Sequence, residues 1–408
     1  MKSEEKQIYK NSIAFMFLIY WLVLVIWQNL GKVTAKTSID AILKLLLLIY
    51  FVITYIKKSR KVNYKIFFAF FLAGMFAITA VNEKSFSINS LISYVYPIIF
   101  IIMVYGFGDK IEINKKQLLM FCNCIIGVVL YTVIYSFIFC FDEFIQALTA
   151  ANAYGNEFSS FFISGHEYGM YLASGIISCL ICLRLYEKIS KRKKIFYIVS
   201  LILFSINLIV TFSRTSIVAV IIFFIIYCIF DNGKLKRRIS LLAFVTLIIC
   251  ITTPTISNFI SNIVFKKNNL AGRDELYINA IEFYKESPTF KKVFGHGINE
   301  TQSYLLRNLG HTSVHNGYLQ ILLTYGIIPL MLLIFFMVVQ VITSIRTMKK
   351  NRFMGTIFLG LVLMSMMVMF TNTSIIFTSS IDSYFLTIFA IVVPKYIKNS
   401  INNNNFDD

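Results

Sequence analysis

Residues 195–230 contain a single charged side chain, and their sequence is IFYIVSLILFSINLIVTFSRTSIVAVIIFFIIYCIF. That charge is Arg214, which divides the stretch into two apolar runs. Each run approaches the roughly 20 apolar residues that a helix needs to cross a membrane. A charge at the centre of a bilayer is costly, so Arg214 is expected at a membrane surface. The stretch therefore predicts two spanning helices joined by a very short turn at residues 213–216.

The apolar character extends over the whole chain of 408 residues. Hydrophobic residues make up 57% of it, charged residues only 14%, and the mean hydropathy is +0.72. A soluble domain has about 45–50% apolar and 25% charged residues, so the composition excludes a cytosolic globular enzyme and a disordered chain. Apolar runs of spanning length number about twelve. They centre on residues 12–30, 39–56, 64–81, 91–107, 118–141, 168–185, 195–212, 214–230, 239–254, 316–345, 353–370 and 382–397.

The fold class expected from these runs is an all-α polytopic integral membrane protein. The first run has no small-residue cleavage site after it, so it is interpreted as a spanning helix and not as a signal peptide. Lys and Arg gather in short cytoplasmic loops of membrane proteins. Here they concentrate at residues 57–65, 184–194, 234–238 and 346–352, which all lie inside if the N-terminus is cytoplasmic. The pI of about 9.5 then reflects membrane topology, and no motif indicates a nucleic-acid partner.

This topology predicts a cytoplasmic membrane protein with both termini inside and one large extracytoplasmic loop. The expected divisions are an N-terminal bundle of about nine helices at residues 1–253, the loop at 254–315, about three helices at 316–398, and a cytoplasmic tail at 399–408. Loops of this length are usually functional or disordered.

The large loop has the pattern of a small folded cap on the membrane surface. A helix is predicted from Asp274 to Lys285, followed by Pro288 and a turn at residues 295–297. Asn299 is the expected N-cap of a second helix, which runs to Leu309 and stops at Gly310.

All four histidines fall on the outer side of the predicted topology. His296, His311 and His315 lie in the large loop, and His166 ends the other long outer loop, residues 142–167. A neutral histidine can take a proton from a hydroxyl group, although a histidine at a membrane surface is more often only an interfacial polar residue. His311 and His315 have the spacing of two zinc ligands on one helical face, but no Glu follows the first and no Cys is near. We therefore expect no metal site.

Positive charge gathers on the same side. Arg214, Arg273 and Arg307 could together bind an anion such as a phosphate group, because guanidinium groups form paired hydrogen bonds with phosphate oxygens. Two simpler interpretations stay open: Arg214 as a topological anchor, and Arg273 as the ion-pair partner of Asp274 or of another nearby acid.

Several motifs of the chain resemble one known family. They are Gly272-Arg273-x-x-Leu276-Tyr277, Pro288, Phe294-Gly295-His296-Gly297, residues 315–322 (HNGYLQIL), Tyr325-Gly326-Ile327-Ile328 and Ser213-Arg214. In this order and setting they resemble the core of the O-antigen polymerase and O-antigen ligase family, a large outer loop that leads into a late spanning helix. Pro329 departs from that pattern and is expected to alter the start of the helix.

The resemblance implies glycosyl transfer at the outer face of the cytoplasmic membrane, from an oligosaccharide linked through diphosphate to a polyprenyl lipid. His315 is the expected catalytic base, and His296 is the second catalytic candidate. Residues expected to bind the substrate or its diphosphate are Arg214, Arg273, Asn316, Arg307 and His311. The activation energy lies in the phosphosugar bond, and the sequence contains no nucleotide-binding phosphate loop. No cofactor is expected.

The acceptor is open between a polymerase, which extends a lipid-linked chain of repeat units for capsule, exopolysaccharide or O-antigen, and a ligase with another acceptor. Enrichment in Lys, Ile and Asn suggests an AT-rich genome of a single-membrane bacterium, which favours the polymerase. A flippase and a chain-length regulator are expected partners beside membrane lipid.

Two other classes of function stay open. A lipid-linked oligosaccharide flippase would also have about twelve spans, but transporters carry ionisable residues deep inside their spans, and here only Lys44 is so placed. In a different glycosyltransferase mechanism, Asp40 would be the base.

Overall fold

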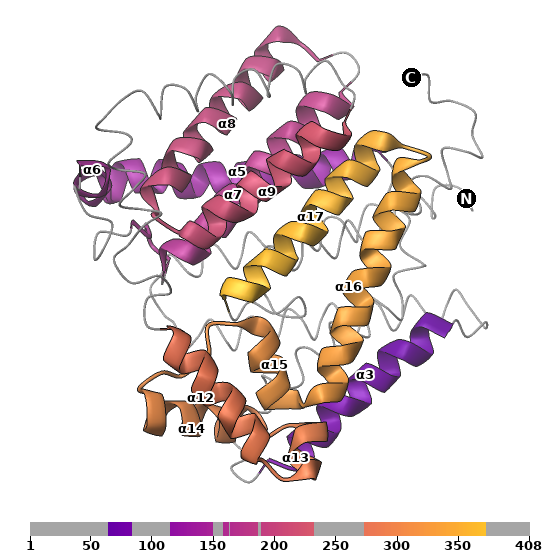
Figure 1. Cartoon of the computed structure of the whole chain (residues 1–408). Coiled ribbons are helices and arrows are strands. Elements are labelled where there is room, and N and C mark those ends of the chain that lie inside the picture. The colour runs from indigo at the N-terminus through magenta and orange to yellow at the C-terminus, as the bar shows by residue number, and fades with distance from the viewer. Residues whose placement is uncertain are drawn as a thin grey trace, which may run out of the picture.

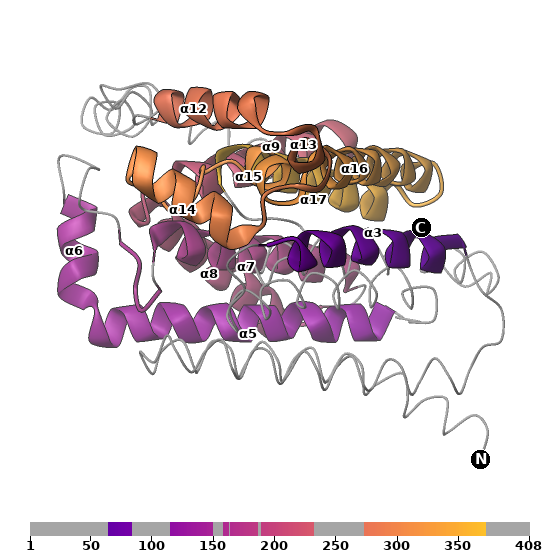
Figure 2. The same cartoon turned by 90° about the horizontal axis from the view of Figure 1, so that it is seen from below.

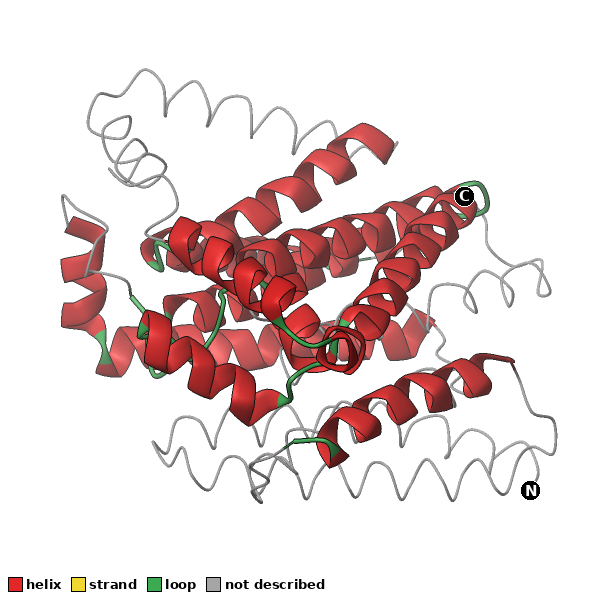
Figure 3. Cartoon of the chain, turned by 60° about the horizontal axis from the view of Figure 1, so that its bottom comes forward, coloured by secondary structure: helices red, strands yellow, loops and turns green. Residues whose placement is uncertain are grey.

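The computed structural model describes residues 64–83, 115–149, 158–162, 164–186, 189–231 and 273–372. All regular structure in these segments is helical, and short loops join the helices (Figures 1 and 3). The spans predicted at 12–30, 39–56, 91–107, 239–254 and 382–397 lie outside the described residues, as does Asp40.

Five described helices are long and apolar enough to cross a membrane: α5 (Lys115–Phe139), α7 (Gly165–Leu185), α8 (Lys191–Val210), α16 (Ile327–Met348) and α17 (Arg352–Thr371). Two shorter apolar segments belong to α3 (Tyr64–Val81) and α9 (Arg214–Phe230). The chain is thus a multi-pass membrane protein whose described residues form helices without strands. The predicted runs 64–81 and 214–230 coincide with α3 and α9, and α5, α7, α8 and α17 differ from their predicted runs by a few residues at their ends.

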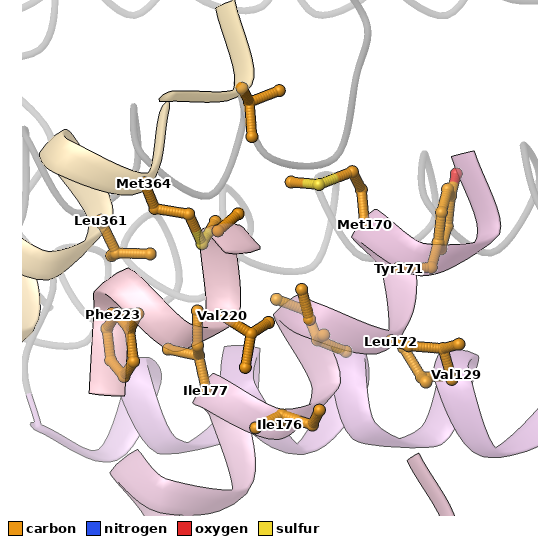
Figure 4. Close-up of a cluster of buried hydrophobic side chains, with 14 of the residues drawn as sticks. Val129, Met170, Tyr171, Leu172, Ile176, Ile177, Val220, Phe223, Leu361 and Met364 are labelled. Carbon is orange, nitrogen blue, oxygen red and sulfur yellow. The ribbon is translucent and has the colours of Figure 1, made fainter. Parts of the chain in front are cut away.

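Helix α7 lies at the centre of the main hydrophobic core. It packs against α5, α8 and α9, and α9 packs in turn along α17. Figure 4 shows side chains of these helices meeting, among them Ile177, Val220 and Leu361. Small residues permit the close approach: a Cβ on Gly360 of α17 would lie 2.7 Å from the ring of Phe223 in α9. Close contact through small residues is typical of helix packing in membranes.

The single span predicted at residues 316–345 is wrong, because the structure contains two helices there. Helix α15 (Gly317–Tyr325) ends at Gly326, and α16 begins at the next residue. Gly326 has φ +92° and ψ −177°, a backbone conformation almost restricted to glycine. Pro329 lies in the first turn of α16, where its missing N–H removes no helical hydrogen bond.

The described part of the large loop contains α12 (Arg273–Glu286), α13 (Thr289–Phe294) and α14 (Ile298–Leu309). These three helices, called the cap below, gather around α15 at one end of the bundle (Figures 1 and 2). They share a small core of their own with α15, formed by Leu276, Ala280, Leu305, Val314 and Leu323. The predicted helix 274–285 is confirmed, and so is the stop at Gly310, which has the left-handed conformation of a helix C-cap.

The predicted N-cap at Asn299 is wrong by two residues. Helix α14 begins at Ile298, with Gly297 as N-cap and no side-chain cap from its own segment. The carboxylate of Glu83, just after α3, instead accepts a hydrogen bond from the backbone N–H of Asn299. A carboxylate is stabilising at a helix N-terminus because the exposed N–H groups there carry partial positive charge.

Further contacts hold the cap on the bundle. The backbone N–H groups of His296 and Gly297 donate to the carbonyls of Leu323 and Thr324, at 2.8 and 3.0 Å. These carbonyls belong to the last turn of α15, where a helix has no further N–H groups to donate to them. The hydroxyl of Thr79 in α3 donates to the carbonyl of Phe294 at 2.6 Å. The Gly295-His296-Gly297 turn is therefore the joint between the cap and the membrane helices.

Candidate active site

The predicted site residues His315, Arg214 and Arg273 lie at the starts of different helices. Arg214 is the first residue of α9, and Arg273 is the first described residue of α12. His315 directly precedes Asn316, the N-cap of α15. His166 is the second residue of α7. Helix N-termini present unpaired N–H groups and favour anions, so this arrangement suits a negatively charged ligand.

Hydrogen bonds join the starts of α7 and α9. The Ser213 side chain caps α9 by accepting from the N–H of Ser216, and it lies 3.5 Å from Nδ1 of His166. The Ser216 hydroxyl donates to the carbonyl of His166 at 3.3 Å. Gly169 makes room for this contact, since a Cβ there would lie 2.6 Å from the Ser216 hydroxyl oxygen. These contacts fix the backbone from which Arg214 extends.

Arg273 is held by the far end of a spanning helix. Its Nη1 donates to the carbonyl of Thr371, the last residue of α17, at 2.9 Å. The C-terminal carbonyls of a helix carry partial negative charge and favour a cation. This contact ties the cap to α17.

The backbone of His315 is held on several sides. Its φ of +52° is left-handed, a conformation that costs a non-glycine residue about 1–2 kcal/mol. The Tyr277 hydroxyl donates to the His315 carbonyl at 3.3 Å, and the Asn316 side chain accepts from the N–H groups of Tyr318 and Leu319. Gln320 accepts from the N–H of Val314 at 3.2 Å. Such strain persists only where neighbours enforce it, which is common at active sites.

Electrostatics favours the neutral form of His315. Burial lowers the pKa of this half-buried imidazole below its ordinary value, and the electrostatic effects of Arg273 and His311 lower it further. Arg273 and His315 also interact electrostatically with His166. His166, Arg273 and His315 thus lie within electrostatic range of one another. A neutral imidazole beside a fixed cation can accept a proton while the cation holds an anion.

His296 lies apart from this group, inside the cap. Its side chain is 4% exposed and stacks on Phe283 with 4.4 Å between ring centroids. Nδ1 lies 3.1 Å from a Glu300 carboxylate oxygen, and Nε2 lies 2.7 Å from the Ser287 hydroxyl. Burial lowers the pKa of His296, while Glu300 opposes that shift. Both ring nitrogens are engaged, and these contacts favour a positioning role over the predicted catalytic one.

The remaining predicted site residues differ in their surroundings. Asn316 is buried and uses its side-chain oxygen as the α15 cap. Arg307 is exposed in the last turn of α14. His311 is exposed, and its ring centroid lies 6.0 Å from that of His315. Among the described residues, no group of three or more His, Cys, Asp or Glu could hold a metal ion.

Sequence reasoning assigned no role to four residues that build this site and its support. Tyr277 and Gln320 hold the backbone around His315, and both lie in motifs of the sequence without an evident function there. His166 was grouped with the other histidines only by its side of the membrane. Glu83 could have been found from the sequence, because it is an acidic residue at the end of a predicted span and charged residues near a membrane span are often functional.

One known protein family matches part of the chain. Residues 198–334 match the family model described as O-antigen ligase, from within α8 to within α16. The match confirms the resemblance predicted from the motifs, and it includes Arg214, Arg273, His296 and His315. No match was found among curated proteins.

Proposed function

We propose that this chain polymerises polyprenyl-diphosphate-linked oligosaccharide repeat units at the outer face of the cytoplasmic membrane. The observation that carries the proposal is His315, whose pKa is lowered and whose backbone is fixed in a left-handed conformation beside Arg273. The family match over residues 198–334 supports glycan transfer as the reaction class.

In the proposed reaction, Arg214 and Arg273 bind the diphosphate of the donor. The N-terminus of α9, from which Arg214 extends, adds its partial positive charge. Negative charge grows on the diphosphate as the glycosidic C–O bond breaks. Fixed cations that meet this charge lower the barrier, because they need no reorganisation during the reaction.

His315 is the proposed base. It takes the proton from an acceptor sugar hydroxyl while that oxygen bonds to the anomeric carbon. The C–O bond to the diphosphate breaks, and its electron pair leaves with the polyprenyl diphosphate. Because attack and departure occur on opposite sides of the carbon, the anomeric configuration inverts. The bonds formed and broken in this step balance without a metal ion or a nucleotide.

The other predicted residues have supporting roles in the proposal. Asn316 orients His315 through the α15 cap, and His311 and Arg307 contact the substrate from the exposed side of the cap. His296 acts through the cap core, where it holds the joint to α15.

Two alternatives remain, a ligase that uses another acceptor and a lipid-linked oligosaccharide flippase. A ligase would share the donor site and differ in the acceptor. A flippase would need no base, so the neutral histidine beside Arg273 favours an enzyme over it.

The test uses purified protein in lipid nanodiscs with a lipid-diphosphate-linked repeat unit as donor and acceptor. We expect a ladder of lengthened glycans on a gel from the wild-type protein, and none from His315→Asn or Arg214→Ala. Asparagine is chosen because it tolerates the left-handed backbone at this position. Arg346→Ala, an exposed arginine in the last turn of α16, is the matched control and should give the wild-type ladder. A single transfer of the glycan that occurs only with a different acceptor would establish the ligase, and intact donor in every lane would favour the flippase.

A further inference from the structure

The short helix α6 (Phe141–Thr149) has an exposed apolar face. Its members Phe141, Ile145 and Leu148 are 50%, 38% and 47% exposed. They recur at positions i, i+4 and i+7, which is the spacing of one helical face. Phe144 and Ala147 form a neighbouring apolar face that is buried. Helix α6 is therefore apolar on two adjacent faces, of which the bundle covers only one.

The buried face fixes α6 beside the start of α7. The ring of Phe144 contacts that of Phe137 in α5, with 5.1 Å between centroids, and that of Phe158, with 5.5 Å. Phe158 in turn contacts Tyr168, the fourth residue of α7, at 5.9 Å. Aromatic pairs at such distances add to the stability gained by burial. Helix α6 is thus attached to the end of the bundle at which His166 lies.

Helix α6 runs across the direction of the spanning helix before it. Helix α5 is long and apolar enough to cross a membrane, and it ends at Phe139. The chain bends at Cys140, and α6 then lies crosswise to α5 (Figures 1 and 2). Because α5 crosses the bilayer, a helix crosswise to its end runs along the membrane surface.

The exposed apolar surface of α5 continues onto α6. Ile134, Ile138 and Phe139, in the last two turns of α5, are each more than half exposed. Such side chains on a spanning helix face the acyl chains, which are as apolar as leucine. Phe141 follows Phe139 by two residues and begins the exposed face of α6. One apolar surface therefore extends from the lipid-facing side of α5 to the helix at its end.

The remaining side of α6 is polar and carries only negative charge. Asp142, Glu143 and Gln146 are exposed, and the helix contains no Lys or Arg. Many interfacial helices combine an apolar face with Lys and Arg that attract anionic lipids. In α6, attachment to a bilayer would depend on apolar burial alone.

The size of the exposed face argues against a second copy of the chain as its partner. The face has three side chains, whereas a stable protein–protein interface has about 20–30 residues on each side. A bilayer sets no such minimum, because it can cover an apolar face of any size that borders a span.

We propose that α6 is an interfacial helix, whose residues Phe141, Ile145 and Leu148 insert among the acyl chains of the bilayer that α5 crosses. Asp142 and Glu143 then face water. Through Phe144 and Phe158, the helix holds the start of α7 at the depth of the lipid headgroups. The inference does not depend on the proposed reaction.

The test measures the depth of single tryptophans placed on the two sides of α6. The chain contains two tryptophans, Trp21 and Trp27, and changing both to Phe gives a background without tryptophan fluorescence. Ile145→Trp reports on the apolar face. Gln146→Trp, on the polar side one residue later, is the matched control. Each full-length variant is placed in nanodiscs of phosphatidylcholine with or without bromine on the acyl chains, since bromine quenches tryptophans that it contacts.

The two tryptophans should respond in opposite ways. Ile145→Trp should lose emission in the brominated discs, emit at shorter wavelength and resist quenching by aqueous iodide. Gln146→Trp should be quenched by iodide and keep its emission in the brominated discs. Leu148→Trp repeats the measurement on the apolar face and should behave as Ile145→Trp does.

Two results would overturn the inference. Quenching of Ile145→Trp and Leu148→Trp by iodide alone would place the apolar face in water. Protection of both from bromine and from iodide would show that protein covers the face, in a second copy or another chain.

A change of lipid charge tests the basis of attachment. Adding phosphatidylglycerol to the brominated discs should leave the loss of emission from Ile145→Trp unchanged, because α6 has no cation to attract it. A loss that appears only with phosphatidylglycerol would contradict attachment by apolar burial.

Discussion

The joint between the cap and α15 offers the sharpest prediction about the scaffold. Gly295 has φ +80° and ψ +173°, a region almost restricted to glycine, and a Cβ there would lie 2.2 Å from the Thr324 carbonyl oxygen. Gly295→Ala must therefore adopt a strained backbone and push the turn away from α15. The strain costs about 1–3 kcal/mol. Loss of the two backbone hydrogen bonds from His296 and Gly297 adds about 1 kcal/mol each.

Gly310→Ala is the matched control. Gly310 also has a positive φ, +68°, but nothing lies within 4 Å of its ideal Cβ. Alanine there should cost only about 1 kcal/mol, the penalty for a left-handed residue. Both substitutions replace glycine by alanine at a positive φ. Only at residue 295 does the new methyl group clash with neighbouring backbone atoms.

The assay is thermal unfolding of both purified variants, followed by intrinsic fluorescence, with glycan polymerisation measured in parallel. Gly310→Ala should lower Tm by about 2–4 °C and keep activity. Gly295→Ala should lower Tm by at least about 6 °C or lose activity as the cap separates from α15. Equal effects of the two substitutions would refute the reasoning that the turn is a tight joint.

Three further predictions concern side chains. Burial, Arg273 and His311 lower the pKa of His315, so the neutral base persists on the acid side of the ordinary histidine range. The substitution His311→Asn removes one of these causes and should raise the pKa of His315. The acid limb of a pH–rate profile should therefore move to higher pH. An unmoved limb would exclude His315 as the titrating base. Glu83→Ala removes the carboxylate at the start of α14 and should cost about 1–2 kcal/mol in thermal unfolding; an unchanged Tm would contradict the cap. His296→Ala loses stacking on Phe283 and two polar contacts, and should lower Tm by more than His315→Asn does. The reverse order of Tm would restore His296 as a catalytic candidate.

The sequence was sufficient to predict the helices whose ends coincide with changes of polarity. Val81 and Phe230 end apolar runs where polar residues begin, and Gly310 stops α14 because glycine favours the left-handed cap. The break at Gly326 was missed because residues on both sides of it are apolar. Hydropathy does not register a change of backbone direction inside an apolar run.

The N-cap at Asn299 was misplaced for a different physical reason. A cap is normally supplied by the segment that it begins, and this rule favours an Asn. Here the acceptor comes from Glu83, more than two hundred positions earlier in the chain. Tertiary contacts of this kind cannot be inferred from local sequence patterns.

The candidate site was predictable in its residue types and only partly in its geometry. Arg273 and His315 were expected to lie together because they share one loop with cationic and titratable residues. The participation of His166 depends on contact between α7 and α9, which no spacing in the sequence reveals. The engagement of both nitrogens of His296 was equally hidden, since Ser287 and Glu300 resemble ordinary surface residues in sequence.

The central claim is direct glycosyl transfer from a lipid diphosphate with His315 as base. It is tested most directly by counting products from wild-type protein in nanodiscs, given the native lipid-linked repeat unit, a chelator and no nucleotide. The account predicts one polyprenyl diphosphate released for each new glycosidic linkage, an inverted anomeric configuration by NMR, and neither product from His315→Asn. Wild-type rates in His315→Asn, or linkages formed without release of polyprenyl diphosphate, would contradict it.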